Sequence, residues 1–345
     1  MRITFAPWGE TLAEMADAAR RAEAAGAEIV WVPELHRSAM TTAAALAAAT
    51  ERARIGTGIA LAFTRSPMTT ALEALDLDDM SGGRFVLGLG TGVRRLNEDW
   101  HNVPFGKPVA HMRETVRNVR EFWRTCTTGD PIDLPGDEEP MRIRGYRRPF
   151  PVRRAGIPVY LAAMGPAMTR LAGTIGDGWI SHELCSPRYL AERVMPELET
   201  GIARADGKRR ADLDVVVSVS CSVAGDRATA LRRASGVVGF YASVRTYADF
   251  FAFHGLAEQQ RAVIDAFRGG TGAERLGETV STEMIDALTV AGGRDEVAER
   301  VAAYEGIADS VKLSAPTHGL GAAETRTAQD ELLSLLPDLT GRSST

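Results

Sequence analysis

The chain has 345 residues, of which 45% are hydrophobic and 25% are charged. This composition is that of an ordinary folded protein, and it excludes disorder, collagen-like repeats and coiled coils. The formal net charge is −5, and no long block of basic residues occurs, so we expect no nucleic-acid partner.

Short apolar or β-branched runs alternate along the chain with longer amphipathic ones, which is the pattern of βα units around a parallel sheet. The first helix is expected over 11–25, because Gly26 provides a typical C-terminal stop. A later helix carries apolar residues at Met112, Val116, Val119 and Trp123, spaced as on one helical face. The predicted strands cover residues 2–5, 28–32, 54–61, 85–89, 158–162, 178–181, 215–223 and 310–314.

Eight strands that alternate with helices favour an α/β fold of the (β/α)8 TIM-barrel type over a doubly wound sheet, because no G-x-G-x-x-G motif opens a helix after the first strand. Residues 125–157, rich in glycine, proline and charge, are expected to form a loop insertion after strand 4. Residues 225–300 are expected to form a helical insertion between strands 7 and 8. The whole chain, 1–345, is therefore predicted to be a single barrel domain.

One predicted face of the helical insertion carries large apolar side chains at helical spacing. We interpret this face as core packing in preference to a substrate-binding surface. Its members are Phe240, Val244, Tyr247 and Phe251.

The cysteines and histidines indicate neither disulfides nor a metal site. Cys126, Cys185 and Cys221 are odd in number and far apart, and the histidines lack metal-ligand spacing. The first ten residues carry no signal-like apolar run, and no stretch reaches about 18 apolar residues. We therefore expect a cytoplasmic protein with no metal that does not enter a membrane.

In a barrel, the chemistry is carried by loops at the carboxyl ends of the strands. Glycines lie within or after three of the predicted strands, at Gly56 and Gly58, at Gly90 and Gly92, and at Gly165 before Pro166. Such glycines let the backbone approach a flat ligand or a phosphate, although each alone could simply make a tight turn. Their presence at one rim indicates an anionic cofactor.

Three segments of the chain resemble the luciferase-like oxidoreductase superfamily. They are Ser81-Gly82-Gly83-Arg84-Phe85-Val86-Leu87-Gly88-Leu89-Gly90, the Arg65-Ser66-Pro67 step, and residues 160–166 with Gly176-Asp177-Gly178-Trp179. Within the superfamily the chain is most similar to the coenzyme F420-dependent branch, which includes methylenetetrahydromethanopterin reductase and F420-dependent glucose-6-phosphate dehydrogenase.

The resemblance implies a barrel, assembled as a homodimer, that binds coenzyme F420, or alternatively FMN, at the carboxyl ends of its strands. In related enzymes a bulge in strand 3 carries a non-prolyl cis peptide bond that backs the ring, and the matching step here is Gly58-Ile59. His182 maps close to the phosphate-bearing tail. The remaining residues implied to contact the cofactor are Glu34, Gly90, Thr91, Gly92, Asn97, Ala163, Met164 and Gly165.

Candidate catalytic residues lie on the same loops. Glu34 follows strand 2, and His36 and His101 have the side chain best suited to proton transfer near neutral pH, although each could be an ordinary surface residue. Ala6, Val93 and Met164 replace polar active-site residues of the pterin reductase. Leu35 stands where the sugar-phosphate dehydrogenase has histidine. We therefore expect neither specific activity to transfer.

Three functions remain open at this point. The first is an F420-dependent oxidoreductase that transfers a hydride between C5 of the deazaflavin and a small organic substrate. The second is an FMN-dependent monooxygenase on the same barrel. The third, suggested by the lost polar residues, is a non-catalytic cofactor-binding barrel.

Overall fold

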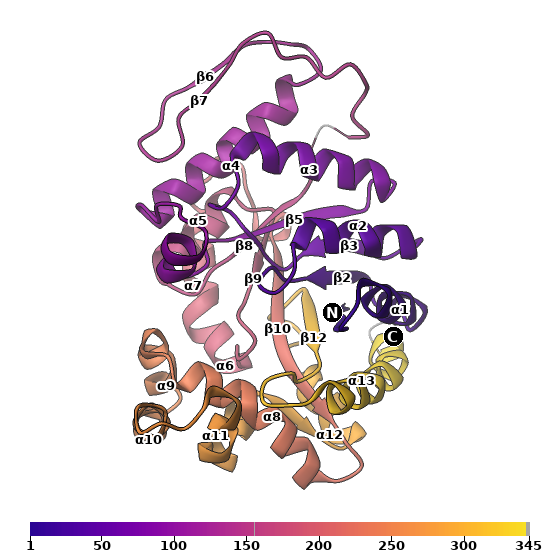
Figure 1. The fold of residues 1–345 in the computed structure, drawn as a ribbon, viewed down its shortest axis with the longest axis vertical. Helices are drawn as coiled ribbons and strands as arrows, with labels where there is room; N and C mark the ends of the chain where they lie inside the picture. The colour runs from indigo at the N-terminus through magenta and orange to yellow at the C-terminus, as the bar shows by residue number, and fades with distance from the viewer. Residues whose placement is uncertain (155, 343–345) are drawn as a thin grey trace. The chain divides into compact units, whose positions relative to one another are not determined.

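The computed structural model describes residues 1–154 and 156–342 and divides into two compact units. The central unit comprises Ile29–Ile180 and Val194–Val215. The terminal unit comprises Met1–Glu28, Ser181–Arg193 and the chain from Val216 onward. Within each unit, parallel strands alternate with helices along the chain (Figure 1).

The central unit is built on parallel strands in the order β2-β3-β5-β8-β9, with the short strand β4 also paired to β5. Every residue of β2 and β5 is buried, as expected for a parallel sheet covered on both faces. The strands are β2 (Ile29–Val32), β3 (Arg54–Thr57), β4 (Ala60–Leu61), β5 (Phe85–Gly90), β8 (Val159–Ala162) and β9 (Gly178–Ile180).

Helices α2, α3 and α4 follow one another along the outside of these strands (Figure 1). Proline occupies the start of α3, α4 and α5, where its missing N–H group is not needed. The helices of this unit are α2 (Ala39–Ala49), α3 (Pro67–Met80), the π-helical turn η1 (Leu96–Trp100), α4 (Pro108–Thr125), α5 (Pro166–Ile175), α7 (Met195–Ile202) and η3 (Arg210–Asp212).

The terminal unit has parallel strands in the order β11-β10-β12-β1. These are β1 (Arg2–Ala6), β10 (Asp214–Val223), whose first two residues belong to the central unit, β11 (Val290–Gly292) and β12 (Ser310–Ser314). Its helices are α1 (Leu12–Ala24), α6 (Pro187–Tyr189), which leads into η2 (Leu190–Val194), α8 (Arg227–Ala242), η4 (Arg245–Tyr247), α9 (Ala248–Phe253), α10 (Ala257–Arg268), η5 (Ala273–Thr279), α11 (Thr282–Leu288), α12 (Arg294–Ala302) and α13 (Ala322–Arg342).

Each strand predicted from the sequence is present, and local signals explain several helix boundaries. The side chain of Thr11 caps α1 by accepting a hydrogen bond from the Glu14 amide, and Gly26 follows the helix at a φ of 92°. Side chains of serine or aspartate cap other helices in the same way, at Ser38, Ser66, Ser186, Asp226 and Ser281.

The two insertions differ from their predicted form. Residues 125–157 are not purely loop, because strands β6 (Ile132–Leu134) and β7 (Met141–Ile143) pair there as an antiparallel hairpin. Residues 225–300 are not wholly helical, because β11 pairs in parallel with the end of β10. This strand is only three residues long and lies directly between two helices, so periodicity alone could not reveal it.

The predicted apolar face over 240–251 was wrong. Helix α8 ends at Ala242, and a 3-10 turn and a new helix follow, so the four residues do not share one helix. Phe240 is 41% exposed, whereas Phe251 is fully buried. Since Val244 has the extended backbone of an N-cap, with φ −101° and ψ 115°, the helical spacing is interrupted at its centre.

Packing explains two of the glycines in the central sheet. A Cβ atom on Gly56 would collide with the Trp31 ring, and one on Gly178 would collide with the Tyr160 ring. These two rings pack together with their centroids 5.8 Å apart. Gly56 therefore makes room for a core aromatic residue and not for a ligand.

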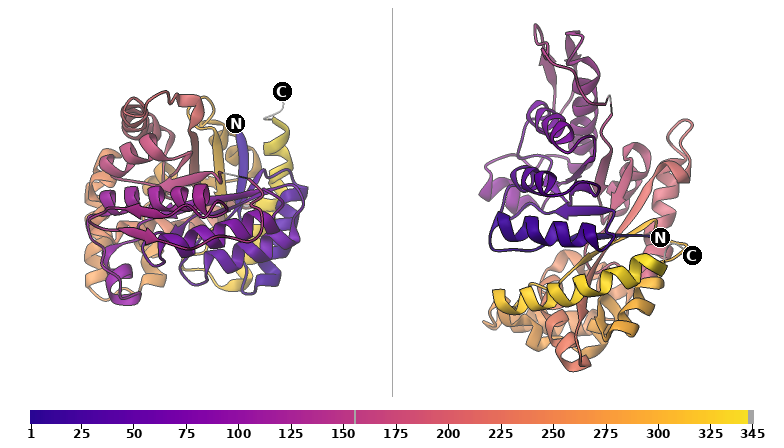
Figure 2. Two further views of the ribbon diagram at one scale, coloured as in Figure 1. Left: turned by 90° about the horizontal axis from the view of Figure 1, so that it is seen from above. Right: turned by 90° about the vertical axis from the view of Figure 1, so that its right-hand side faces the viewer.

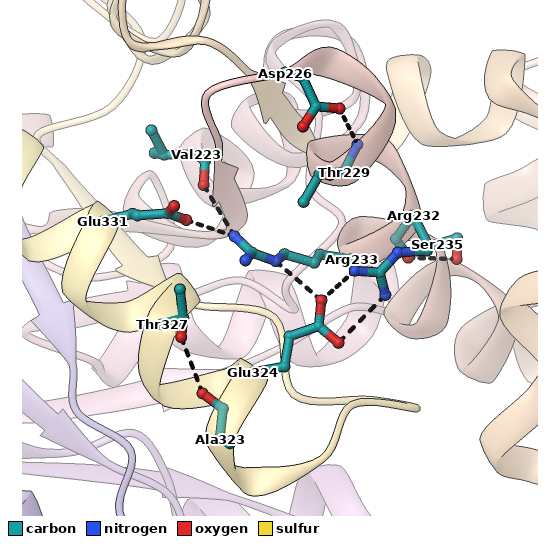
Figure 3. A network of polar contacts seen from close by, with 10 residues as sticks. All are labelled: Val223, Asp226, Thr229, Arg232, Arg233, Ser235, Ala323, Glu324, Thr327 and Glu331. Carbon is teal, nitrogen blue, oxygen red and sulfur yellow. Dashed lines mark hydrogen bonds and ion pairs between the residues drawn. The ribbon is translucent and has the colours of Figure 1, made fainter.

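Helix α13 lies beside α1 in the terminal unit, as the right-hand view of Figure 2 shows, and an Arg21–Asp330 ion pair of 2.7 Å joins them. Figure 3 shows a further contact of α13, in which Arg233 of α8 binds residues of α13. The Arg233 guanidinium donates to Glu324 at 3.2 Å, to Glu331 at 2.5 Å and to the Val223 carbonyl at 3.4 Å.

No helix in the part of the chain that the structure describes is long and apolar enough to cross a membrane. Among the same residues, no group of three or more His, Cys, Asp or Glu side chains could hold a metal ion.

We expect Arg233→Met to lower the free energy of unfolding by about 2 kcal/mol. The Arg233 side chain is only 8% exposed, and its removal leaves Glu331 without its cation and Glu324 with Arg232 alone, although both carboxylates retain some contact with water. The neighbouring Arg232→Met is the matched control, because Arg232 is 57% exposed and pairs with the same Glu324; its expected cost is below about 1 kcal/mol. Denaturant unfolding of both variants measures the difference, and equal losses would contradict this account.

Candidate active site

In the central unit an ion pair joins the predicted site residue Glu34, which follows β2, to Arg65, which follows β4. Two parallel hydrogen bonds join Arg65 to Glu34, Nη1 to Oε2 at 2.8 Å and Nη2 to Oε1 at 2.5 Å. A third group, Glu73 of α3, lies 3.3 Å from Arg65 Nε. The Glu34 and Arg65 side chains are 10% and 17% exposed. Such a bidentate pair fixes geometry as well as charge.

Glu34 also bonds to the break between β3 and β4 and to β4 itself. Its backbone N–H donates to the Ile59 carbonyl at 3.0 Å. Its carboxylate accepts from the Leu61 amide at 2.8 Å and from the Ala39 amide at 3.4 Å. The Gly58-Ile59 peptide within this break is cis, which confirms that prediction. Glu34 and Arg65 thus form a frame around the bulge.

The electrostatics of this frame keep Glu34 ionised. Burial alone would raise the pKa of Glu34, but the hydrogen bonds from Arg65 and from the Leu61 amide outweigh it and hold the pKa below its usual range. Burial raises the pKa of Glu73, and the proximity of Glu34 adds to that effect. At neutral pH the Glu34 carboxylate is therefore an acceptor and not a proton donor, which fits positioning better than general acid catalysis.

The loop after β5 packs closely against the bulge. A Cβ atom on Gly90 would lie 2.7 Å from the Ile59 side chain. Gly92 has a φ of +62°, and a Cβ there would lie 2.8 Å from Leu61. Glycine is therefore required at both positions because the Ile59 and Leu61 side chains approach the β5 loop so closely. Thr91, between them, turns its hydroxyl onto the Gly92 carbonyl at 2.8 Å.

Asn97 is fully buried beneath this loop and carries an unused acceptor. Its Nδ2 donates to the carbonyls of Thr91 at 2.8 Å and Val93 at 3.0 Å. These two acceptors determine the orientation of the amide. Its Oδ1 is buried and has no hydrogen-bond partner among the described residues. A buried acceptor of this kind needs a donor from a ligand or a water molecule.

The loop after β8 offers open backbone. The Ala163 carbonyl accepts from Trp179 Nε1 at 3.0 Å, which anchors the loop to β9. No atom lies within 4 Å of a Cβ built on Gly165, and Gly165 is the N-cap of α5 without any side-chain cap. Met164 lies between these two residues. An uncapped helix N-terminus with open space beside it suits an anionic group.

The predicted histidines fall in different places. His36 and His101 are both exposed on loops of the central unit. His182 belongs to the terminal unit, where aromatic rings surround it. The structure thus brings Glu34, the bulge, the β5 loop and Asn97 together, while the two exposed histidines make no hydrogen bond within the described chain.

Sequence reasoning missed Arg65 and Glu73 as members of the site. Arg65 was noted only as part of a family motif, yet an acid after strand 2 and a base after strand 3 come from adjacent parallel strands. The carboxyl ends of neighbouring parallel strands meet at one edge of the sheet. The opposite charges of Glu34 and Arg65 could therefore have predicted an ion pair at this edge.

The sequence of residues 3–310 matches a family model described as luciferase-like monooxygenase. The chain belongs to this family. The luciferase-like resemblance found in the sequence is thereby confirmed.

Two relatives of this luciferase-like chain cover most of its length. A protein of Mycobacterium tuberculosis, named provisionally as a coenzyme F420-dependent oxidoreductase, is 30% identical over 298 residues, or 82% of this chain and 85% of the relative. The 5,10-methylenetetrahydromethanopterin reductase of Archaeoglobus fulgidus is 30% identical over 291 residues, or 81% and 82%.

A solved structure supports the fold. The coenzyme F420-dependent tetrahydromethanopterin reductase of Methanopyrus kandleri matches with a TM-score of 0.83 at 22% identity, over 99% of this chain and 98% of that chain. The (β/α)8 barrel predicted from the sequence is therefore confirmed.

We expect Arg65→Gln to lower the free energy of unfolding by about 2 to 3 kcal/mol, because it leaves the Glu34 carboxylate without its cation in a poorly hydrated position. Arg94→Gln is the control: Arg94 is 60% exposed and pairs with Glu98 one helical turn away, so its expected cost is below about 0.5 kcal/mol. Denaturant unfolding at pH 7 measures both, and similar losses in the two variants would contradict the buried frame.

The same frame predicts a sensitivity to acid. Because the pKa of Glu34 is lower in the folded chain than its ordinary value of 4.5, its contribution is fully present above about pH 4.5. It is lost as the pH falls through the lower folded value. We expect Arg65→Gln to remove much of this loss, so that its stability curve between pH 5 and pH 3 is flatter than that of the unmodified protein; parallel curves would argue against the pairing.

Proposed function

We propose that this chain is a coenzyme F420-dependent oxidoreductase that transfers a hydride between the deazaflavin and a small organic substrate. Relatives at 30% identity carry the names of a coenzyme F420-dependent oxidoreductase and of a methylenetetrahydromethanopterin reductase. The observation that carries the proposal is the buried Oδ1 of Asn97, which has no hydrogen-bond partner among the described residues. A deazaflavin, which presents a ring N–H at its polar edge, would supply the missing donor.

The residues present fit such a group. When bound, the deazaflavin supplies the hydride chemistry at C5. Glu34 and Arg65 hold the Gly58-Ile59 bulge that would back the ring, and Asn97 would accept from the ring edge. Gly90, Thr91 and Gly92 would line the ring through their backbone.

The anionic end of the cofactor would meet the backbone of Ala163, Met164 and Gly165 at the start of α5. His182, which the resemblance implies to be close to the tail, belongs to the terminal unit and lies among aromatic rings, so we do not include it among the contacts of the anionic tail. His36 and His101 are exposed and are proposed to carry the proton that accompanies the hydride. We further propose a cytoplasmic homodimer, as the resemblance implies.

Anaerobic titration with oxidised and reduced F420 and FMN tests the proposal. We expect F420 to bind more tightly than FMN. Asn97→Ala should weaken F420 binding by about 5- to 100-fold, because it deletes the acceptor for a buried donor. His36→Ala and His101→Ala should leave F420 affinity unchanged.

Asn118→Ala is the matched control. Asn118 is also a fully buried asparagine, but its Nδ2 donates to the Glu139 carbonyl at 2.6 Å, under the hairpin. We expect its F420 affinity to equal that of the unmodified chain. A clear preference for FMN would favour the monooxygenase, and no binding of either cofactor would refute the proposal.

A further inference from the structure

Aromatic rings from several elements of the terminal unit surround His182, which follows β9. The His182 ring centroid lies 4.8 Å from that of Phe250, 5.8 Å from Tyr247, 6.0 Å from Tyr241 and 6.5 Å from Tyr189. We call these five residues the His182 cluster. Its rings come from α6, α8, η4 and α9, so that much of the helical insertion contributes to it.

His182 is a neutral hydrogen-bond donor in this cluster. Its Nδ1 accepts from the Leu184 amide at 3.2 Å, which places the ring proton on Nε2. Burial, followed by the nearby His254, lowers the pKa of His182 to about 3, so the ring is uncharged at neutral pH. Nε2 is buried and has no hydrogen-bond partner among residues 1–154 and 156–342.

Two partly buried tyrosines, Tyr241 and Tyr247, contribute rings to the same cluster. The rings of Tyr241 and Tyr247 meet edge to face at 4.9 Å. Within the described chain neither hydroxyl makes a hydrogen bond. Burial, with the Glu183 carboxylate as a further cause, raises the pKa of Tyr247 to about 12 and also raises that of Tyr241. Both hydroxyls therefore keep their protons.

The charge around the cluster restricts its ligand. The Glu183 carboxylate lies close enough to both tyrosines to affect their ionisation, so a bound anion would be repelled. A cation could accept a lone pair from either hydroxyl, but the N–H of His182 offers it none. An uncharged oxygen, in a carbonyl, hydroxyl or ether, accepts hydrogen bonds without either penalty. The surrounding rings offer apolar edges to a flat or hydrocarbon portion of the same molecule.

We infer that the His182 cluster is a recognition site for an uncharged organic ligand, which it binds through an accepting oxygen held by His182 Nε2–H and by the hydroxyls of Tyr241 and Tyr247. Calling this ligand the substrate rests on the proposed function, whereas the binding chemistry does not. The site lies within the terminal unit and uses none of the residues of the Glu34–Arg65 frame.

The test uses four aromatic probes of similar size: acetophenone, ethylbenzene, benzoate and phenyltrimethylammonium. Binding is followed by NMR of protein labelled with ¹⁵N-histidine. The chain has six histidines, and the signals of His182 are assigned by their loss in His182→Asn. We expect the free protein to show the Nε2–H form of His182. Acetophenone should shift that nitrogen and bind at least about 10-fold more tightly than ethylbenzene, while benzoate and phenyltrimethylammonium should leave it unshifted.

Tyr241→Phe and Tyr247→Phe remove one hydroxyl each and keep the rings. We expect each to weaken acetophenone binding by about 3- to 10-fold. Tyr146→Phe is the matched control, because this tyrosine packs on Phe122 in the central unit, 5.2 Å between centroids, and its loss should change nothing. Unchanged affinity in both cluster variants, or tighter binding of either charged probe, would overturn the inference.

Titration of the same proteins with F420 separates the two proposals. If F420 binds and acetophenone does not shift His182, the cluster is not this recognition site and the proposed function stands. If acetophenone shifts His182 and neither form of F420 binds, the recognition site stands and the proposed function fails.

Discussion

The bidentate ion pair between Arg65 and Glu34 is the contact on which the candidate site depends. It connects the loop after β2 with the loop after β4, and through the Leu61 amide and the Ile59 carbonyl it holds the bulge between them. Two charges kept from water in this way are costly unless their remaining hydrogen-bonding capacity is used. Here the backbone of the bulge and Glu73 supply that capacity, so charge pairing and backbone geometry support each other.

The bulge in turn dictates residues that belong to other strands. Positions 90 and 92 require glycine because the side chains of Ile59 and Leu61 occupy the space that a Cβ atom would need. The Asn97 side chain donates hydrogen bonds to two carbonyls of the β5 loop. Its Oδ1 atom has no hydrogen-bond partner among the described residues. Much of what looks like a ligand cradle is therefore internal packing, and the position that points to a ligand is the buried acceptor that packing leaves unused.

The sequence was informative wherever a signal is local. Strands and helices followed from periodicity and capping residues, and the cis peptide at Gly58-Ile59 followed from the family resemblance. Arg65 was overlooked because its partner is 31 positions away in the chain, and a salt bridge between loops has no periodic signature. The break in the helix after Ala242 was also missed, since the apolar spacing continues across it. The role of His182 depends on which rings surround it, and these come from four separate elements.

The pairing of β1 with β12 has a consequence for folding during synthesis. Arg2 and Ala6 pair with Ser310 and Ser314, which lie 308 residues further along the chain. Strands β3, β5 and β8, by contrast, pair with strands that lie within Ile29–Ile180. During synthesis the edge of β1 that pairs with β12 therefore stays unpaired until the residues of β12 have emerged, and an unpaired strand edge can pair with wrong partners.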